Sequence, residues 1–298
     1  MKHQFLLHPF LIPERLINVK DNIPAGEIFN TPEIAANCFY FNHSQWAKLY
    51  FEACHRDTHF KERWDAAVGS WDDKVVVDIG CGPGNLYANL GGKPKMLIGV
   101  DIAEGALKMA REIGYTPLQA DAHHIPLVSG FADIVAMNAT LHHCQNMHTA
   151  LAEAARLVKP GGILVIDHDP QLSAWHYKGV GMLLYQMRLS VIYRFFLRDL
   201  YIPDEERLAA LATEIHHKPG HGVTQELFYK TLEPLGFTVQ IYPHNNMVGA
   251  KALQGECGKP PHWRYRVGQF FSGINPYSSE SALSLMCIAI KQSPQPDN

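Results

Sequence analysis

Three glycines that alternate over five positions follow an apolar run and an acid in VVVDIGCGPGNL, residues 75–86. Asp78 stands two residues before Gly80, and Gly82 and Gly84 follow at every second position. Glycines in a strand-to-helix turn let the backbone approach a ligand closely, and the amides of the helix start favour negative charge. The segment therefore predicts a binding site for a small molecule.

Two common ligands of such a turn fit this sequence poorly. A phosphate-binding P-loop needs a Lys-Ser/Thr pair, and none follows Gly84. A dinucleotide loop needs glycine at its sixth position, where Asn85 stands when the count starts at Gly80. Asp78 would also repel a pyrophosphate, whereas it suits a ligand that carries an ammonium group.

The segments around this loop predict a doubly wound parallel sheet. Continuously apolar runs, as in doubly buried parallel strands, occupy residues 74–80, 96–102, 115–121, 132–138 and 161–169. Helical patterns lie between them at residues 85–90, 104–113 and 147–158. A helix at 224–235 and strands at 236–242 and 283–291 resume the pattern after a helical insertion, which makes seven strands in all.

Five strand ends carry motifs in the order typical of one enzyme family. The motifs are VVVDIGCGPGNL, GVDIAEGALKMA, QADAHHIPL, FADIVAMNATLHHC and AARLVKPGGILVIDHD. Over residues 72–170 the chain resembles the class I S-adenosylmethionine-dependent methyltransferases. This resemblance implies a Rossmann-like α/β fold, a mostly parallel seven-stranded sheet with an antiparallel last strand, and S-adenosyl-L-methionine as cofactor.

The resemblance also implies which residues hold the cofactor. It places Asp101 at the ribose hydroxyls, Asp121 at the adenine amino group, Ala122 beside the ring and Asn138 at the methionyl end. Asp101 ends the second strand, where two hydroxyls need a bidentate acceptor. The predicted cofactor-binding set is Asp78, Gly80, Cys81, Gly82, Gly84, Asn85, Asp101, Ile102, Asp121, Ala122 and Asn138.

Three histidines at strand ends are candidates for the chemistry of methyl transfer. His142 and His143 follow the fourth strand, and His168 ends the fifth beside Asp169. A sulfonium methyl group transfers by in-line displacement, so a base is needed only where the acceptor must lose a proton. We expect these histidines to act as a base or to orient the acceptor. Histidines bonded to the backbone at a turn or cap are the alternative.

The segment HHKPGHG, residues 216–222, offers three histidines within six positions. No carboxylate or cysteine accompanies them in the segment, so a solvent-exposed loop is favoured over a metal site. We therefore predict no metal ion for this chain.

The helical insertion predicted at residues 171–222 contains an unusual apolar and aromatic stretch at 175–203. Because a connection this long in a compact domain is usually functional, we expect a lid over an acceptor with apolar surface. A core or dimer-interface helix and a basic amphipathic helix at a membrane surface are the alternatives. The aromatic residues of 245–280 could close the other side of the pocket, and those of 38–50 could supply aromatic edges over the cofactor.

The rest of the chain completes the predicted organisation. Residues 1–70 are an N-terminal part with an extended arm over 1–37 and a helix over 43–68. Residues 71–170 are the cofactor-binding core, and residues 223–298 complete its sheet.

The composition bounds the class of protein. The 298 residues carry a formal net charge of -3, which argues against a nucleic-acid partner, because such proteins normally carry a basic stripe. Six scattered cysteines and the lack of a long apolar run predict a cytoplasmic protein with reduced thiols and no stable membrane insertion.

These observations predict a methyltransferase that acts on a small, partly apolar or aromatic acceptor of the secondary-metabolite kind. Transfer to oxygen, nitrogen or carbon is left open, as is a homodimer. A lipid- or quinone-like acceptor at a membrane surface, and a non-catalytic binding protein with this fold, are the alternatives.

Overall fold

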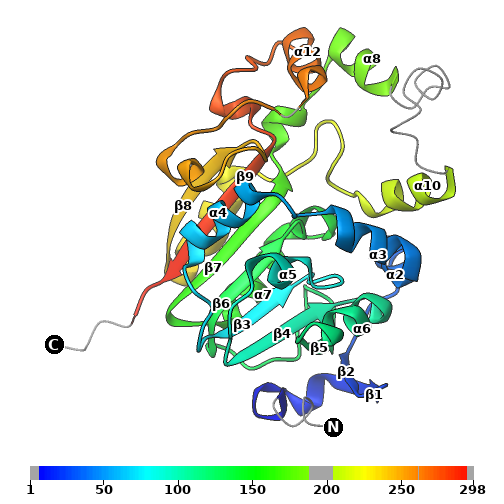
Figure 1. Cartoon of the computed structure of the whole chain (residues 1–298), viewed down its shortest axis with the longest axis vertical. Coiled ribbons are helices and arrows are strands. Elements are labelled where there is room, and N and C mark those ends of the chain that lie inside the picture. Colours follow the sequence, from blue (N-terminus) through cyan, green and yellow to red (C-terminus); the bar gives the residue numbers. More distant parts are fainter. Residues whose placement is uncertain (1–6, 188–203, 261, 294–298) are drawn as a thin grey trace.

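One mixed sheet organises the computed structural model, which describes residues 7–187, 204–260 and 262–293. Within these ranges nine strands are ordered β1-β2-β5-β4-β3-β6-β7-β9-β8 (Figure 1). In chain order they are β1 Leu16–Lys20, β2 Ile23–Gly26, β3 Val75–Ile79, β4 Met96–Asp101, β5 Thr116–Gln119, β6 Ala132–Asn138, β7 Val158–Pro170, β8 Phe237–His244 and β9 Ser284–Lys291.

The central strands are parallel, as their continuous apolar runs predict. β3 pairs in parallel with β4 on one side and with β6 on the other, so the direction of chain growth reverses at β3. β9 runs antiparallel to both β7 and β8. The predicted fold class is confirmed, and the reversal at β3 creates the crevice where such sheets bind ligands.

In the part of the chain that the structure describes, the sheet has nine strands rather than the seven predicted, because residues 16–26 form a hairpin on the β5 edge. Asp21 and Asn22, with φ values of 52° and 61°, make the turn, and such a turn matches the twist of paired strands. Ile23 and Ala25 are buried in the core. The prediction of an extended surface arm over residues 1–37 is therefore wrong for this part.

Helices cover both faces of the sheet. The described helices are α2 Pro32–Asn42, α3 Ser44–Ala53, α4 Thr58–Val68, α5 Asn85–Leu90, α6 Glu104–Glu112, α7 Met147–Leu157, α8 Gly179–Met187, α10 Asp204–Thr213, α11 Gln225–Leu232 and α12 Trp263–Phe271. Apolar residues of α4, α5 and α6 pack in one core cluster, and those of α7 and α11 pack in the other. None of these described helices is long and apolar enough to cross a membrane.

The single helix predicted over residues 43–68 is in fact two helices. Asp57 caps α4 by accepting a hydrogen bond from the backbone N–H of Phe60 at 2.8 Å. His55 adopts the left-handed conformation, with φ 61°, in the turn before it. A helix-start signal inside the apolar pattern thus divides the helix.

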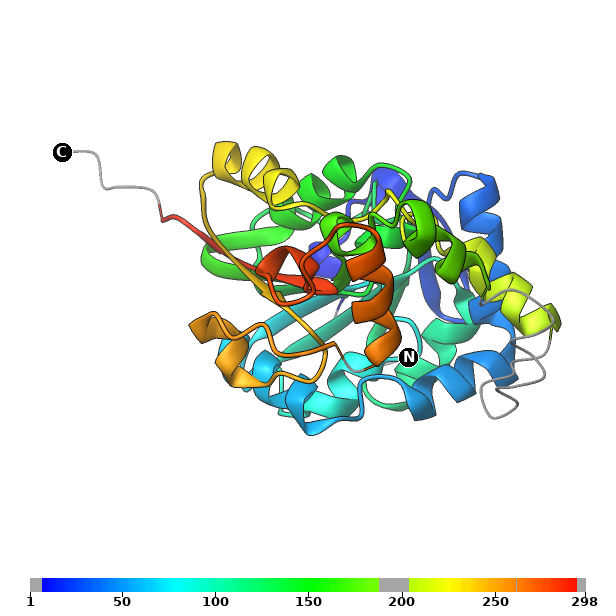
Figure 2. The same cartoon turned by 90° about the horizontal axis from the view of Figure 1, so that it is seen from above.

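The described helices of the insertion, α8 and α10, pack against two different parts of the molecule. α8 lies beside α12, as both views show (Figure 1, Figure 2), and α10 packs on α2. Trp175 and Tyr177 join Met182, Tyr185 and Tyr265 in a small apolar cluster. Most of the lid predicted over 175–203 lies outside the described residues.

Candidate cofactor and methyl-transfer site

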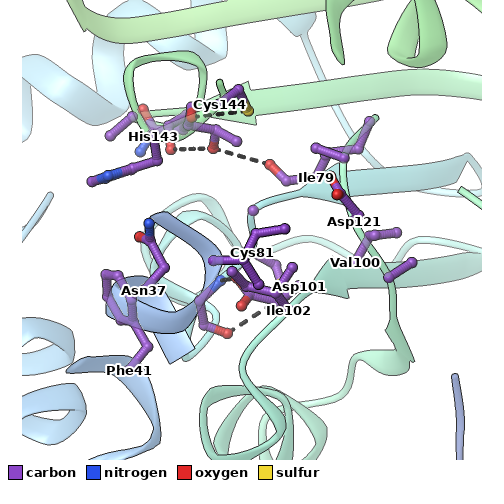
Figure 3. Close-up of a pocket in the computed structure, with 18 of the residues that line it drawn as sticks. Asn37, Phe41, Ile79, Cys81, Val100, Asp101, Ile102, Asp121, His143 and Cys144 are labelled. Atoms are coloured by element: carbon purple, nitrogen blue, oxygen red, sulfur yellow. Dashed lines mark hydrogen bonds between the residues drawn. The ribbon is translucent and has the colours of Figure 1, made fainter. Parts of the chain in front are cut away.

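A cavity of about 430 Å³ lies at the carboxyl ends of β3, β4, β5 and β6, with α2 and α3 on its other side (Figure 3). This volume falls within the range of small-molecule sites. The cavity brings together one of the three predicted histidines, His143, and most of the predicted cofactor set. The members of that set that line it are Asp78, Gly80, Cys81, Gly82, Asn85, Asp101, Ile102, Asp121, Ala122 and Asn138.

The three glycines of the loop have different neighbours. A Cβ on Gly80 would collide with the Thr140 side chain, and one on Gly84 would lie 2.6 Å from Ile113. A Cβ on Gly82 would meet no atom within 4 Å. Of the three, Gly82 therefore leaves space for a ligand, while Gly80 and Gly84 permit close packing of the protein itself. Gly84 does not line the cavity.

Backbone amides hold the Asp101 carboxylate at the end of β4. Its Oδ2 accepts from the Gly82 N–H at 2.8 Å, and its Oδ1 accepts from the Ala103 N–H at 2.8 Å. Burial raises the pKa of Asp101, and the two amides oppose this rise. Because each carboxylate oxygen has two lone pairs, acceptor capacity remains for a pair of ligand hydroxyls.

Asp78 is a buried acid on the cavity wall. The Tyr115 hydroxyl donates to its Oδ2 at 2.7 Å. Burial raises the pKa of Asp78 to about 7. A carboxyl group in this setting gains most from a cationic ligand, because a nearby positive charge restores its ionised form.

Asp121 and His123 form a pair after β5. Both the backbone N–H and the ring Nδ1 of His123 lie near Asp121 Oδ1, at 2.9 and 2.5 Å. Burial raises the pKa of Asp121, but the bonds from His123 outweigh it and hold that pKa below its usual value. Asp121 is therefore a fixed anion that can accept from an amino group.

His143 donates a hydrogen bond to a carbonyl through one ring nitrogen, and its other ring nitrogen carries an unprotonated lone pair. Its Nδ1 lies 2.7 Å from the Thr213 carbonyl oxygen, which can only accept, so the proton is on Nδ1. Burial lowers the pKa of His143 to about 4. At neutral pH the residue is thus a neutral imidazole whose Nε2 can accept a proton or a hydrogen bond.

The other two predicted histidines do not line the cavity. His142 Nδ1 faces Asp169 Oδ1 at 2.8 Å, and burial lowers the pKa of His142 to about 4. His168, in the left-handed region with φ 62°, packs its ring near those of Phe60 and His55. The placement gives neither residue access to this cavity, and their catalytic roles stay predictions.

Asp167 directly precedes His168 in the chain and belongs to a buried structural network. Its carboxylate contacts Arg63 Nε at 3.1 Å and His244 Nε2 at 2.7 Å. Burial raises the pKa of Asp167, but the charges of Arg63 and His244 outweigh burial and hold this pKa well below its usual range. The network ties α4 and β8 to β7.

His55 is a cavity residue that the sequence analysis missed. Its Nε2 lies 3.0 Å from Asn138 Nδ2 and 3.4 Å from the Tyr50 hydroxyl. Burial lowers the pKa of His55 to about 3. The capping residue Asp57 is the signal that marks a turn here, but nothing in the sequence shows that the turn meets β6.

The outer wall of the cavity comes from the N-terminal part of the chain. Its residues are Phe29, Thr31, Glu33, Ile34, Asn37, Phe41, Tyr50 and His55. Asn85 fastens this wall to the glycine loop by donating to the Tyr50 and Cys54 carbonyls, at 3.2 and 3.3 Å. No described residue of 171–222 or 245–280 lines this cavity. The stretch 38–50, expected to supply aromatic edges, contributes Phe41 and Tyr50.

Comparison with known proteins identifies the domain. The family described as Methyltransferase domain matches residues 77–166. The ubiquinone biosynthesis O-methyltransferase of Thiobacillus denitrificans is 30% identical over 150 residues, covering 47% of this chain and 61% of that protein. The malonyl-[acyl-carrier protein] O-methyltransferase of Yersinia pestis is 36% identical over 95 residues, covering 31% and 36%.

The name of a third relative indicates that it acts on RNA. The tRNA (carboxymethyluridine(34)-5-O)-methyltransferase of Arabidopsis thaliana is 36% identical over 96 residues, covering 31% of this chain and 23% of that protein. The chain thus spans less than two thirds of the length of each of these three relatives.

Solved structures share the fold at lower identity. A methyltransferase of Thermotoga maritima, described as a possible histamine N-methyltransferase, is 17% identical with a TM-score of 0.50, covering 86% of this chain and 100% of that one. The plantazolicin methyltransferase, solved with SAH, is 18% identical with a TM-score of 0.50, covering 88% and 96%. Residues 77–166 match a methyltransferase domain, and the chain shares its fold with these solved methyltransferases.

Proposed function

We propose that this chain transfers the methyl group of S-adenosylmethionine to a small acceptor bound against its N-terminal wall. One observation carries the proposal. Residues at four strand ends, predicted separately from their motifs, line a single cavity together with His143. Their side chains offer the acceptors that an amino-acid-bearing nucleoside needs.

Each acid in the cavity matches one part of this cofactor. Asp101 would accept from the ribose hydroxyls, Asp121 from the adenine amino group, and Asp78 would face the ammonium group. The space over Gly82 gives the ligand room beside the loop. The cofactor supplies an activated methyl group, while these residues bind and orient it.

The acceptor is proposed to be small and partly apolar or aromatic. The outer wall offers the aromatic rings of Phe29, Phe41 and Tyr50 and the aliphatic side chain of Ile34. His143 Nε2 supplies the polar group that would take a proton or a hydrogen bond from an acceptor O–H or N–H. The names of two relatives favour oxygen as the methylated atom.

A quinone-like phenol at a membrane surface is the second candidate acceptor. The Thiobacillus denitrificans relative acts in ubiquinone biosynthesis by its name, and such a phenol would suit an aromatic wall. Co-sedimentation of the whole chain with anionic liposomes separates the two candidates. Binding supports the membrane-surface acceptor, and its absence supports a freely diffusing one.

The cofactor placement is tested by titration calorimetry with S-adenosylhomocysteine. Asp101→Ala removes both the proposed ribose acceptor and the anchor of Gly82, so affinity should fall by about 100-fold or more. Asp65→Ala is the matched control, because Asp65 is an exposed acid paired with Lys61 outside the cavity. An unchanged affinity in Asp101→Ala would contradict the placement.

Methyl transfer itself is tested with methyl-labelled cofactor and a panel of phenols, quinols, amines and carboxylic acids. A tRNA pool belongs in the panel because of the Arabidopsis thaliana relative. Label in a small molecule supports the proposal, and label in tRNA alone contradicts it. Cofactor binding without transfer to any member favours a non-catalytic binding protein.

A further inference from the structure

Three side chains outside the cofactor cavity converge beside the loop after β6. They are His142 from that loop and Glu214 and His217 from the segment that follows α10. His142 Nε2 lies 3.4 Å from Glu214 Oε2, and His217 Nδ1 lies 3.0 Å from the same oxygen. The three potential ligand atoms all lie within 4.8 Å of one another.

A buried carboxylate fixes the orientation of His142. Asp169 Oδ1 lies 2.8 Å from His142 Nδ1 and accepts from the His142 backbone N–H at 3.0 Å. With its proton on Nδ1, His142 directs the lone pair of Nε2 at Glu214. A carboxylate behind a histidine in this way is the arrangement that orients metal-binding histidines.

The segment that carries Glu214 and His217 is held in place by other bonds. The His216 N–H donates to the His142 carbonyl at 3.0 Å, and His143 Nδ1 donates to the Thr213 carbonyl at 2.7 Å. The Trp175 ring packs edge-on against His217, with centroids 4.4 Å apart. The three ligand atoms are therefore brought together before any ion binds.

We propose that His142, Glu214 and His217 bind one divalent transition-metal ion, for which Zn²⁺ is the best-matched ion. Two imidazole nitrogens and a carboxylate oxygen are ligands that zinc takes at about 2.0–2.2 Å. In a tetrahedral site such ligands stand about 3.4 Å apart, close to the two separations observed. Three protein ligands leave a fourth position for water or another oxygen ligand.

The proposed site departs from the prediction of no metal ion, which weighed only the residues within HHKPGHG. Glu214 stands just before the segment, and His142 reaches it from a distant part of the chain. The site is separate from the cofactor cavity, but the His142 ring lies 4.0 Å from that of the cavity residue His143. Metal binding at this site can be tested without an acceptor.

The test uses the whole chain, stripped with a chelator and titrated with ZnCl₂ against a chromophoric competitor. We expect one tight equivalent in the wild type. Glu214→Gln and His217→Ala should each lower zinc affinity by about 100-fold, since each removes a direct ligand. His221→Ala is the matched control: its ring neighbours His216 in the same loop, and it should bind zinc like the wild type.

A second readout is the thermal midpoint with and without zinc. Zinc should raise it in the wild type and in His221→Ala but not in Glu214→Gln, because a ligand stabilises only the state that binds it. Asp169→Asn should weaken zinc binding by about tenfold without abolishing it. Circular dichroism confirms that each variant is folded. No stoichiometric uptake by the wild type, or uptake that the ligand variants leave unchanged, overturns the proposal.

Discussion

The two sides of the cofactor cavity are built in different ways. On the sheet side, the functional groups stand at strand ends and are fixed by backbone hydrogen bonds, as Asp101 is by Gly82 and Ala103. On the outer side, helices α2 and α3 present side chains that touch mainly through rings, such as Phe41 against Tyr50 with centroids 5.5 Å apart.

This difference separates what the family shares from what this chain adds. The sheet side lies almost entirely within the matched residues 77–166, and the outer wall lies before them. Backbone-fixed acceptors suit a ligand that never changes, while a packed wall of side chains can vary with the acceptor. We therefore expect mutations on the sheet side to alter cofactor binding and mutations in the wall to alter acceptor choice.

His143 should give the largest effect, because it comes from the sheet side but would serve the acceptor. Loss of an acid–base group lowers turnover by about 100-fold or more, and His143→Ala should do so. Affinity for S-adenosylhomocysteine should stay within about threefold of wild type, since no cofactor contact is proposed for it. His143→Gln, which keeps an acceptor oxygen, should retain more turnover. Full turnover in both variants would mean that positioning alone drives the reaction.

Alanine substitutions of Gly80 and Gly82 should affect different properties: the first should lower stability, and the second should weaken cofactor binding. Gly80→Ala puts a methyl group into Thr140 at a φ of 69°, and we expect a stability loss of about 2–3 kcal/mol in urea unfolding. Gly82→Ala, at φ 51°, meets no protein atom and should cost only about 1 kcal/mol. Its methyl group would instead occupy ligand space and weaken cofactor binding.

The Gly80→Ala, Thr140→Ala double variant serves as the control for this pair. It should recover part of the stability that Gly80→Ala loses, because it removes the colliding side chain. If Gly80→Ala and Gly82→Ala lost the same cofactor affinity and had the same stability, Gly80 would not be a packing glycine and Gly82 a ligand-contact glycine.

The same contrast explains what the sequence could predict. Asp101 was predicted both from the resemblance and from its place at the end of the second strand, where parallel strands bring their carboxyl ends to one edge. Asp121 was predicted from the resemblance alone. Phe41 and Tyr50 lie in the stretch 38–50 that was named as a source of aromatic edges, but nothing local distinguishes them from its other aromatic residues, which do not line the cavity. The grouping of Glu214 with His142 was not predicted, since the two residues are distant in the chain.

The N-terminal hairpin was missed for a local reason. Pro24 argues against a strand, yet it lies in β2 opposite Val19 of β1, and β2 pairs with β5 only at the next residue, Ala25. The two-residue turn of Asp21 and Asn22 was the available signal. The domain boundaries predicted at residues 70, 170 and 222 remain predictions.

Asp78 should make cofactor binding depend on pH in one direction. Because burial raises the pKa of Asp78 to about 7, the group is mostly protonated at about pH 6 and mostly ionised at about pH 7.5. Only the ionised form attracts an ammonium group, so affinity for S-adenosylhomocysteine should rise by about tenfold over this interval. Calorimetry in buffers of different ionisation enthalpy should show proton release at the lower pH.

Asp78→Asn is the control for this pH dependence. It should bind more weakly at about pH 7.5 and lose most of the slope, because the amide has no proton to release. If the affinity of this variant still rose with pH, a group other than Asp78 would be responsible for the titration.

Phe41→Ala should locate the boundary between the two sides. Phe41 lines the cavity, and its ring stands edge-on to His143 with centroids 6.5 Å apart. Removing the ring should raise the acceptor KM by about tenfold and change cofactor affinity by less than about threefold. Phe39→Ala is the matched control, because Phe39 is on the same helix, is 58% exposed and does not line the cavity. If Phe41→Ala instead weakens cofactor binding at unchanged KM, α2 belongs with the sheet side, and acceptor choice must be sought beyond the N-terminal wall.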